Sequence, residues 1–164
     1  MNILALDLGT HAGWARNYGP LPWCGTRHLA KKGEIEKWSA TRMLRRCDPR
    51  IERFYSFLTG LFSPPDLVVF EDVEFSTYTY QTQLWASLRA ALWVAFDKRA
   101  VIECVPVQAL KKFATGAGSA TKEQMRAALV RESGPKWDGM DDNAIDAQWI
   151  LRWAEKNLSR MIVA

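Results

Sequence analysis

The sequence predicts an α/β domain with a mixed sheet. Three short segments at residues 2–8, 12–18 and 25–30 have the composition of strands joined by tight turns. Apolar strand segments and helical segments then alternate to the end of the chain, which is the order found in α/β domains. The chain has 164 residues, the size of one domain. We therefore expect a single domain over residues 1–164.

The first strand is predicted at residues 2–8, where residues 3–6 form a continuous apolar run. Such a run is typical of a strand that is buried on both faces. Asp7 interrupts it, and an unpaired buried charge is very costly. The carboxylate therefore needs either a position where the strand opens into a site, or a cation. Gly9 and Gly13 would permit a tight turn and close approach to a ligand. The alternative is an Asx-type turn, and Asp7 alone does not decide between them.

The middle of the chain contains two amphipathic helical patterns. The first covers about residues 39–62, with Pro49 inside it either kinking the helix or splitting it in two. Residues 66–71 then form a second apolar strand that ends in Glu71. The second helical pattern covers residues 79–97.

In the last third of the chain, the sequence pattern predicts one strand and three helices. A strand of the buried type is expected at residues 101–105, followed by a short helix at 106–113. Thr121 is a plausible helix cap, and a helix is expected from there through Arg131. The last helix is predicted at residues 142–156.

The composition indicates a cytoplasmic protein. The three cysteines, Cys24, Cys47 and Cys104, have no metal-binding spacing and are odd in number, which favours free thiols in a reducing compartment. We see no signal peptide and no apolar run of membrane-spanning length, so we expect no membrane partner. A net charge of +4 permits a polyanionic partner without establishing one.

Carboxylates follow the apolar strands and begin the last helix. Asp7 and Glu71 stand at strand ends, and ligand sites of α/β sheets lie beyond the carboxyl ends of strands. Asp142 and Asp146 are four residues apart, so they share one face of a helix. Converging carboxylates repel one another, and hard oxygen ligands suit Mg²⁺ or Mn²⁺. Two such ions can clamp the attacking and leaving oxygens of a phosphodiester.

Each acid also has an ordinary structural explanation. Glu71 precedes Asp72 and Glu74 and could be a polar strand exit, whereas Asp141 and Asp142 could simply be N-cap and dipole residues. Asp146 is harder to explain in this way, because it lies between Ile145 and Ala147, one turn inside a largely apolar helix.

The order of these segments resembles that of the RuvC-like Holliday junction resolvases of the RNase H-like superfamily. The resemblance covers nearly the whole chain, and its specificity lies in the joint order of four short motifs. These are Leu4-Ala-Leu-Asp-Leu-Gly-Thr10 with Gly13, Val68-Val-Phe-Glu-Asp72, Gly116-Ala-Gly-Ser-Ala-Thr-Lys122 and Asp141-Asp-Asn-Ala-Ile-Asp-Ala147. It implies an RNase H-like fold, with a central mixed sheet and helices on both faces.

The resemblance also implies a metal-dependent endonuclease that resolves Holliday junctions or other branched DNA. Asp7, Glu71 and Asp146 would hold two Mg²⁺ ions, with Mn²⁺ as a substitute. The family usually has a further acid three residues before the last one, where this chain has Asn143. We favour Asp142 as the fourth ligand and catalytic carboxylate, since one helical turn keeps it on the face of Asp146.

Lys122 matches a family lysine near the scissile phosphate, where it would stabilise transition-state charge. The alternative is a solvated lysine in the first helical turn after the Thr121 cap. The products would carry a 5′-phosphate and a 3′-hydroxyl.

Several further residues are candidates for DNA contact. In the family an aromatic residue after the strand Glu stacks at the opened junction centre, and Phe75 and Tyr78 are candidates here. Basic residues near the proposed site could bind phosphates, although such a run is often a solvated helix face. They are Arg42, Arg46, Lys111 and Lys112.

The family acts as a homodimer, which matches two symmetric cuts on a two-fold junction. The helix at residues 80–96 could carry that interface or belong to the core.

Other functions remain open at this point. Leu6-Asp-Leu-Gly-Thr10 also resembles the phosphate-binding hairpin of sugar kinases and actin-like ATPases, but those proteins need a second such domain. RNase H-like nucleases that process ribosomal RNA begin similarly, but they generally lack a strand-end acid like Glu71. An inactive nucleic-acid-binding module is a further alternative, against which the complete set Asp7, Glu71 and Asp146 argues.

Overall fold

The computed structural model describes residues 1–20, 23–40, 47–61, 63–73 and 79–158. A five-stranded mixed sheet occupies its centre, in the order β3-β2-β1-β4-β5. Antiparallel strands β1, β2 and β3 come first in the chain, and β4 and β5 pair in parallel on the other side of β1. The strands are β1 (Ile3–Asp7), β2 (His11–Arg16), β3 (Cys24–His28), β4 (Leu67–Asp72) and β5 (Val101–Pro106).

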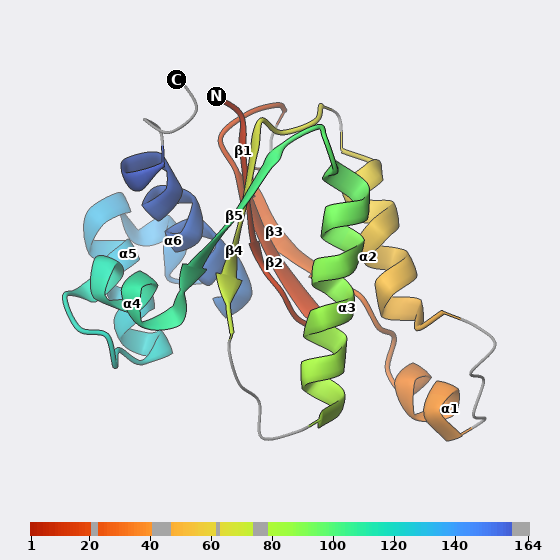
Figure 1. The fold of residues 1–164 in the computed structure, drawn as a ribbon. Helices are drawn as coiled ribbons and strands as arrows, with labels where there is room; N and C mark the ends of the chain where they lie inside the picture. Colours follow the sequence, from red (N-terminus) through yellow and green to blue (C-terminus); the bar gives the residue numbers. More distant parts are fainter. Residues whose placement is uncertain (21–22, 41–46, 62, 74–78, 159–164) are drawn as a thin grey trace.

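Helices cover both faces of this sheet, as Figure 1 shows. The long helices α2 and α3 lie on one side, and α4, α5 and α6 lie on the other. The predicted α/β class and mixed sheet are therefore confirmed. The helical segments are α1 (Glu34–Ala40), α2 (Pro49–Thr59), α3 (Thr79–Phe96), α4 (Val107–Thr115), α5 (Lys122–Ser133), the 3₁₀ turn η1 (Pro135–Trp137) and α6 (Asp142–Asn157).

Alternation along β1 and β4 divides the apolar residues into two layers. Leu4, Leu6 and Val68 point into the layer with α2 and α3. Ile3 and Val69 point into the opposite layer, which contains α4, α5 and α6. Because successive side chains of a strand point to opposite faces, both strands are buried on both sides.

Of the two alternatives expected for the helical pattern over residues 39–62, a kink or a split at Pro49, the structure shows a separate second helix that starts there. Helix α2 begins at Pro49, and the Asp48 side chain caps it by accepting a hydrogen bond from the Arg50 backbone N–H at 2.9 Å. Proline at the first helical position lacks only a donor that would be unpaired there anyway. Pro49 therefore starts this helix, and residues 41–46 lie outside the described part of the chain.

Candidate active site

Asp7 and Glu71 leave the sheet side by side. Strands β1 and β4 are parallel, and Leu6 pairs with Phe70, so Asp7 and Glu71 occupy the next level of the sheet. Side chains two positions apart in a strand point to the same face. Asp7 and Glu71 are therefore on the same face as Ile3 and Val69, which point toward the layer containing α6. The strand order thus brings together two acids that are 64 positions apart in the sequence.

Asp146 comes from α6, which packs across β1 and β2 on this face. Gly13 pairs with Asp7 and lets the helix approach closely. A Cβ added at Gly13 would lie 2.0 Å from the carbonyl oxygen of Asn143, which is far inside van der Waals contact. Only glycine at this place lets the first turn of α6 lie against β2, one turn before Asp146.

The three acids are electrostatic neighbours. Burial raises the pKa of Asp7 to about 8, and the charges of Asp146 and Glu71 add to the shift. Burial and the charge of Asp146 raise the pKa of Glu71 to about 7. The pKa of Asp146 is raised to about 6, chiefly by burial, with Asp142 adding to the shift. Gathering these carboxylates therefore costs free energy near neutral pH unless a cation joins them.

Two lysines partly offset this negative charge. Lys122 is the first residue of α5, whose start is fixed by a capping box between Thr121 and Gln124. Its Nζ lies 3.9 Å from Oδ2 of Asp146. Lys111 on α4 lowers the pKa of both Glu71 and Asp146. Both lysines thus stand beside the carboxylates, whereas Lys112 is exposed on the surface of α4.

Asp142 differs from the other acids because an arginine binds its carboxylate through a direct hydrogen bond. Its Oδ1 accepts a short hydrogen bond from Nη2 of Arg126 on α5. Asn143, at the position where the resemblance expects an acid, is held by its neighbour: its Nδ2 donates to Oδ1 of Asp141 at 2.7 Å. That same oxygen accepts from the Thr26 hydroxyl at 2.7 Å.

The donor set matches a hard divalent cation. Three oxygen donors approach from three separate elements, and within the described residues no hydrogen bond reaches the carboxylates of Asp7 or Glu71. Mg²⁺ and Mn²⁺ prefer such carboxylates, with remaining positions left to water and substrate. As the side chains are placed in the described ranges, no group of three or more Asp, Glu, His or Cys residues could hold a metal ion without some movement.

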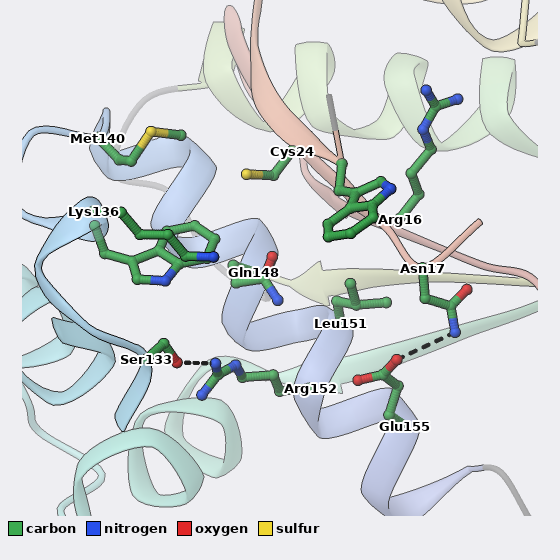
Figure 2. A pocket seen from close by; sticks show the side chains of 12 residues that line it. Arg16, Asn17, Cys24, Ser133, Lys136, Met140, Gln148, Leu151, Arg152 and Glu155 are labelled. Atoms are coloured by element: carbon green, nitrogen blue, oxygen red, sulfur yellow. Dashed lines mark hydrogen bonds between the residues drawn. The ribbon is translucent and has the colours of Figure 1, made fainter. Parts of the chain in front are cut away.

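A separate hollow of ≈ 840 Å³ runs along another face of α6. Figure 2 shows it between α6 and the strand that carries Cys24, with Arg16 and Asn17 on one side and Lys136 and Met140 on the other. None of the three site acids lines it. Helix α6 thus contributes its start to the carboxylate site and its later turns to this hollow.

Comparison with solved structures identifies the fold. RuvC of Thermus thermophilus in complex with a Holliday junction substrate matches with a TM-score of 0.65 and 20% identity, covering 92% of this chain and 90% of that one. A second structure of Thermus thermophilus RuvC matches with a TM-score of 0.64 and 19% identity, again covering 92% of this chain and 90% of that one.

The chain has the RuvC-like fold. The yeast mitochondrial Holliday junction resolvase also matches, with a TM-score of 0.57 and 13% identity, over 90% of this chain and 75% of that one. No family model matches the sequence, and a search of curated proteins finds no significant match. The RNase H-like fold expected from the motif order is confirmed by the structural likeness rather than by sequence similarity.

Several predicted contacts lie outside the described residues, namely Phe75, Tyr78, Arg42 and Arg46. Two arginines of the following helix α2 form ion pairs within the fold. Arg50 forms a buried ion pair with Asp48, and Arg53 pairs with Glu34 at 2.6 Å. No helix of the described residues is long and apolar enough to cross a membrane.

Sequence reasoning missed Arg126. The available signal was its spacing, because Arg126 lies four residues after Lys122 and so on the same side of α5.

Proposed function

We propose that this protein is a metal-dependent endonuclease that cuts branched DNA, with the Holliday junction as its main substrate. The observation that carries the proposal is the convergence of Asp7, Glu71 and Asp146 at one end of the sheet, with pKa values raised by burial and by one another. The likeness to RuvC supports the choice of substrate.

Asp7, Glu71 and Asp146 would hold two Mg²⁺ ions, or Mn²⁺ in their place. When bound, such ions supply an activated water and stabilise the charge on the scissile phosphate. Lys122 stands beside Asp146, where its ammonium group can neutralise charge that develops on a phosphate oxygen. Lys111 adds a second positive charge near Glu71. Hydrolysis would leave a 5′-phosphate and a 3′-hydroxyl.

A homodimer is part of the proposal, because two symmetric cuts need two active sites. Helix α3 supplies a candidate interface. Its inner side is core, with Leu88 and Leu92 fully buried, but Trp93 and Val94 are 52% and 69% exposed. Exposed apolar side chains of this size are typical of interaction surfaces when they lie together. Light scattering on the purified chain measures the oligomeric state.

The decisive experiment compares four substrates in Mg²⁺ buffer: a synthetic four-way DNA junction, linear duplex DNA, an RNA–DNA hybrid and structured RNA. We expect cleavage of the junction, with Asp7→Asn retaining junction binding and losing cleavage. Preferential cutting of RNA or of the hybrid would redirect the proposal to an RNA-processing nuclease. If Asp7→Asn cuts like the wild type, the assignment of the site is wrong. ATP hydrolysis without cleavage would point to a nucleotide-binding function instead.

A further inference from the structure

Arg126 joins the start of α6 to helix α5. Its Nη1 donates to the backbone carbonyl oxygens of Trp137, Asp138 and Met140 at 3.3, 3.0 and 2.5 Å. Its Nη2 donates to the carboxylate of Asp142. One guanidinium thus holds four acceptors along the segment that leads into α6, a task suited to its fixed fork of five donors.

This segment determines where Asp146 lies. Asp142 is the first residue of α6, and Asp146 follows one turn later on the same face. On its other side the helix start is held by the hydrogen bond from Thr26 to Asp141 and rests against Gly13. A shift of the helix start would therefore move the Asp146 carboxylate relative to the two acids on the sheet.

The environment of Asp142 also differs from that of Asp146. The Asp142 side chain is 43% exposed and bound by the Arg126 guanidinium, whereas the Asp146 side chain is 18% exposed. A carboxylate paired with Arg must give up that charge-assisted hydrogen bond, at least in part, before it can bind a metal. The pairing favours a role for Asp142 in holding the helix.

We propose that Arg126 is a positioning residue for the carboxylate site, and that Asp142 is its anchor rather than a fourth metal ligand. The inference rests on the proposed function, because it requires that Asp7, Glu71 and Asp146 bind a divalent metal. Arg126 acts through the position of α6 and touches no reacting group itself.

The test is a titration of the full-length protein with Mn²⁺, in which electron paramagnetic resonance follows the signal of the free ion. Arg126→Gln removes the guanidinium, and Asp142→Asn keeps an oxygen that accepts from Arg126. Arg152→Gln is the matched control. Arg152 is as exposed as Arg126 (26% against 25%) and also bridges α5 and α6, through Glu132, but further along α6.

We expect Arg126→Gln to weaken Mn²⁺ binding by about 10–100-fold, the usual effect of losing a residue that orients metal ligands. Asp142→Asn should stay within about threefold of the wild type, since its anchoring hydrogen bond survives. Arg152→Gln should bind Mn²⁺ like the wild type. In Arg126→Ala, added guanidinium at constant ionic strength should restore part of the affinity, which a general loss of stability would not allow.

Four outcomes would overturn the inference. Unchanged or tighter Mn²⁺ binding by Arg126→Gln would show that Arg126 does not position the site. A loss in Asp142→Asn as large as that in Asp146→Asn would make Asp142 a ligand. Equal losses in Arg126→Gln and Arg152→Gln would reduce the effect to helix packing. A wild-type protein that binds no Mn²⁺ would overturn the proposed function, and the inference with it.

Discussion

Two groups of acids lie near one another in the structure but have opposite surroundings. Asp7, Glu71 and Asp146 are drawn from three elements, and burial and mutual repulsion raise their pKa values. Asp141 instead has a pKa lowered by the Thr26 hydroxyl and by Asn143. Asp142 likewise has its own partner in Arg126.

The comparison separates two uses of a carboxylate. An acid whose hydrogen bonds are satisfied by the protein stabilises the fold, as a helix cap or an ion-pair partner does. An acid that is buried beside other acids destabilises the fold until a cation arrives, and is therefore a candidate for function. The sharpest tests remove one member of each group and compare the results.

The largest expected effect is on cleavage. Asp146→Asn should lower the cleavage rate of a four-way junction by about 100-fold or more, since a ligand to the proposed ions is lost. Its metal-free melting temperature should rise, because one repelling charge is removed. Asp141→Ala should keep most of the cleavage activity. Its free energy of unfolding should fall by about 1 kcal/mol, because the N-cap of α6 is lost. If both variants melt below the wild type, the division into two groups fails.

The second effect concerns the close approach of α6 to β2. Gly13→Ala should lower the free energy of unfolding by about 1–3 kcal/mol, because its methyl group would overlap the Asn143 carbonyl. Cleavage should fall as well, since Asp146 moves with the helix. Gly139→Ala is the control, because no atom lies within 4 Å of a Cβ there. Chemical denaturation measures both, and equal stability of the two variants would contradict the packing described here.

The third effect is on the pH dependence of stability. Between about pH 4 and pH 8 the folded, metal-free protein holds protons on Asp7, Glu71 and Asp146 that the unfolded chain has released. Their contribution to the free energy of unfolding therefore falls as pH rises through this range. We expect Asp7→Asn to flatten this fall and Mg²⁺ to reverse it at high pH. Thermal melts across the range, with and without Mg²⁺, check both, and identical pH profiles for variant and wild type would count against the buried acid cluster.

The smallest effect distinguishes two adjacent lysines. Lys111→Ala should slow cleavage by about tenfold or less, because its partly exposed charge acts on Glu71 and Asp146 through screening solvent. Lys112→Ala should leave the cleavage rate nearly unchanged and reduce the salt dependence of DNA binding if Lys112 contacts a phosphate. A larger loss of cleavage for Lys112→Ala would place the substrate elsewhere on α4.

Short-range sequence patterns predict several strands and helices of this fold. They leave an element undecided where two local signals favour different structures. The apolar runs before Asp7 and Glu71 determine β1 and β4, because only a doubly buried strand suits such runs. The apolar spacing over residues 39–62 left a kink and a split at Pro49 equally open, and the Asp48 cap beside Pro49 makes it a helix start.

The sequence by itself determined which acidic residues are candidates for the site. It also determined that two of them stand at strand ends and that Asp146 lies one turn inside a helix. The tertiary structure decided which of them meet. The strand order places β4 beside β1, and the absence of a side chain at Gly13 allows α6 to pack next to Asp7. Arg126 forms an ion pair with Asp142. These outcomes depend on contacts between distant segments, whose energies no local periodicity encodes.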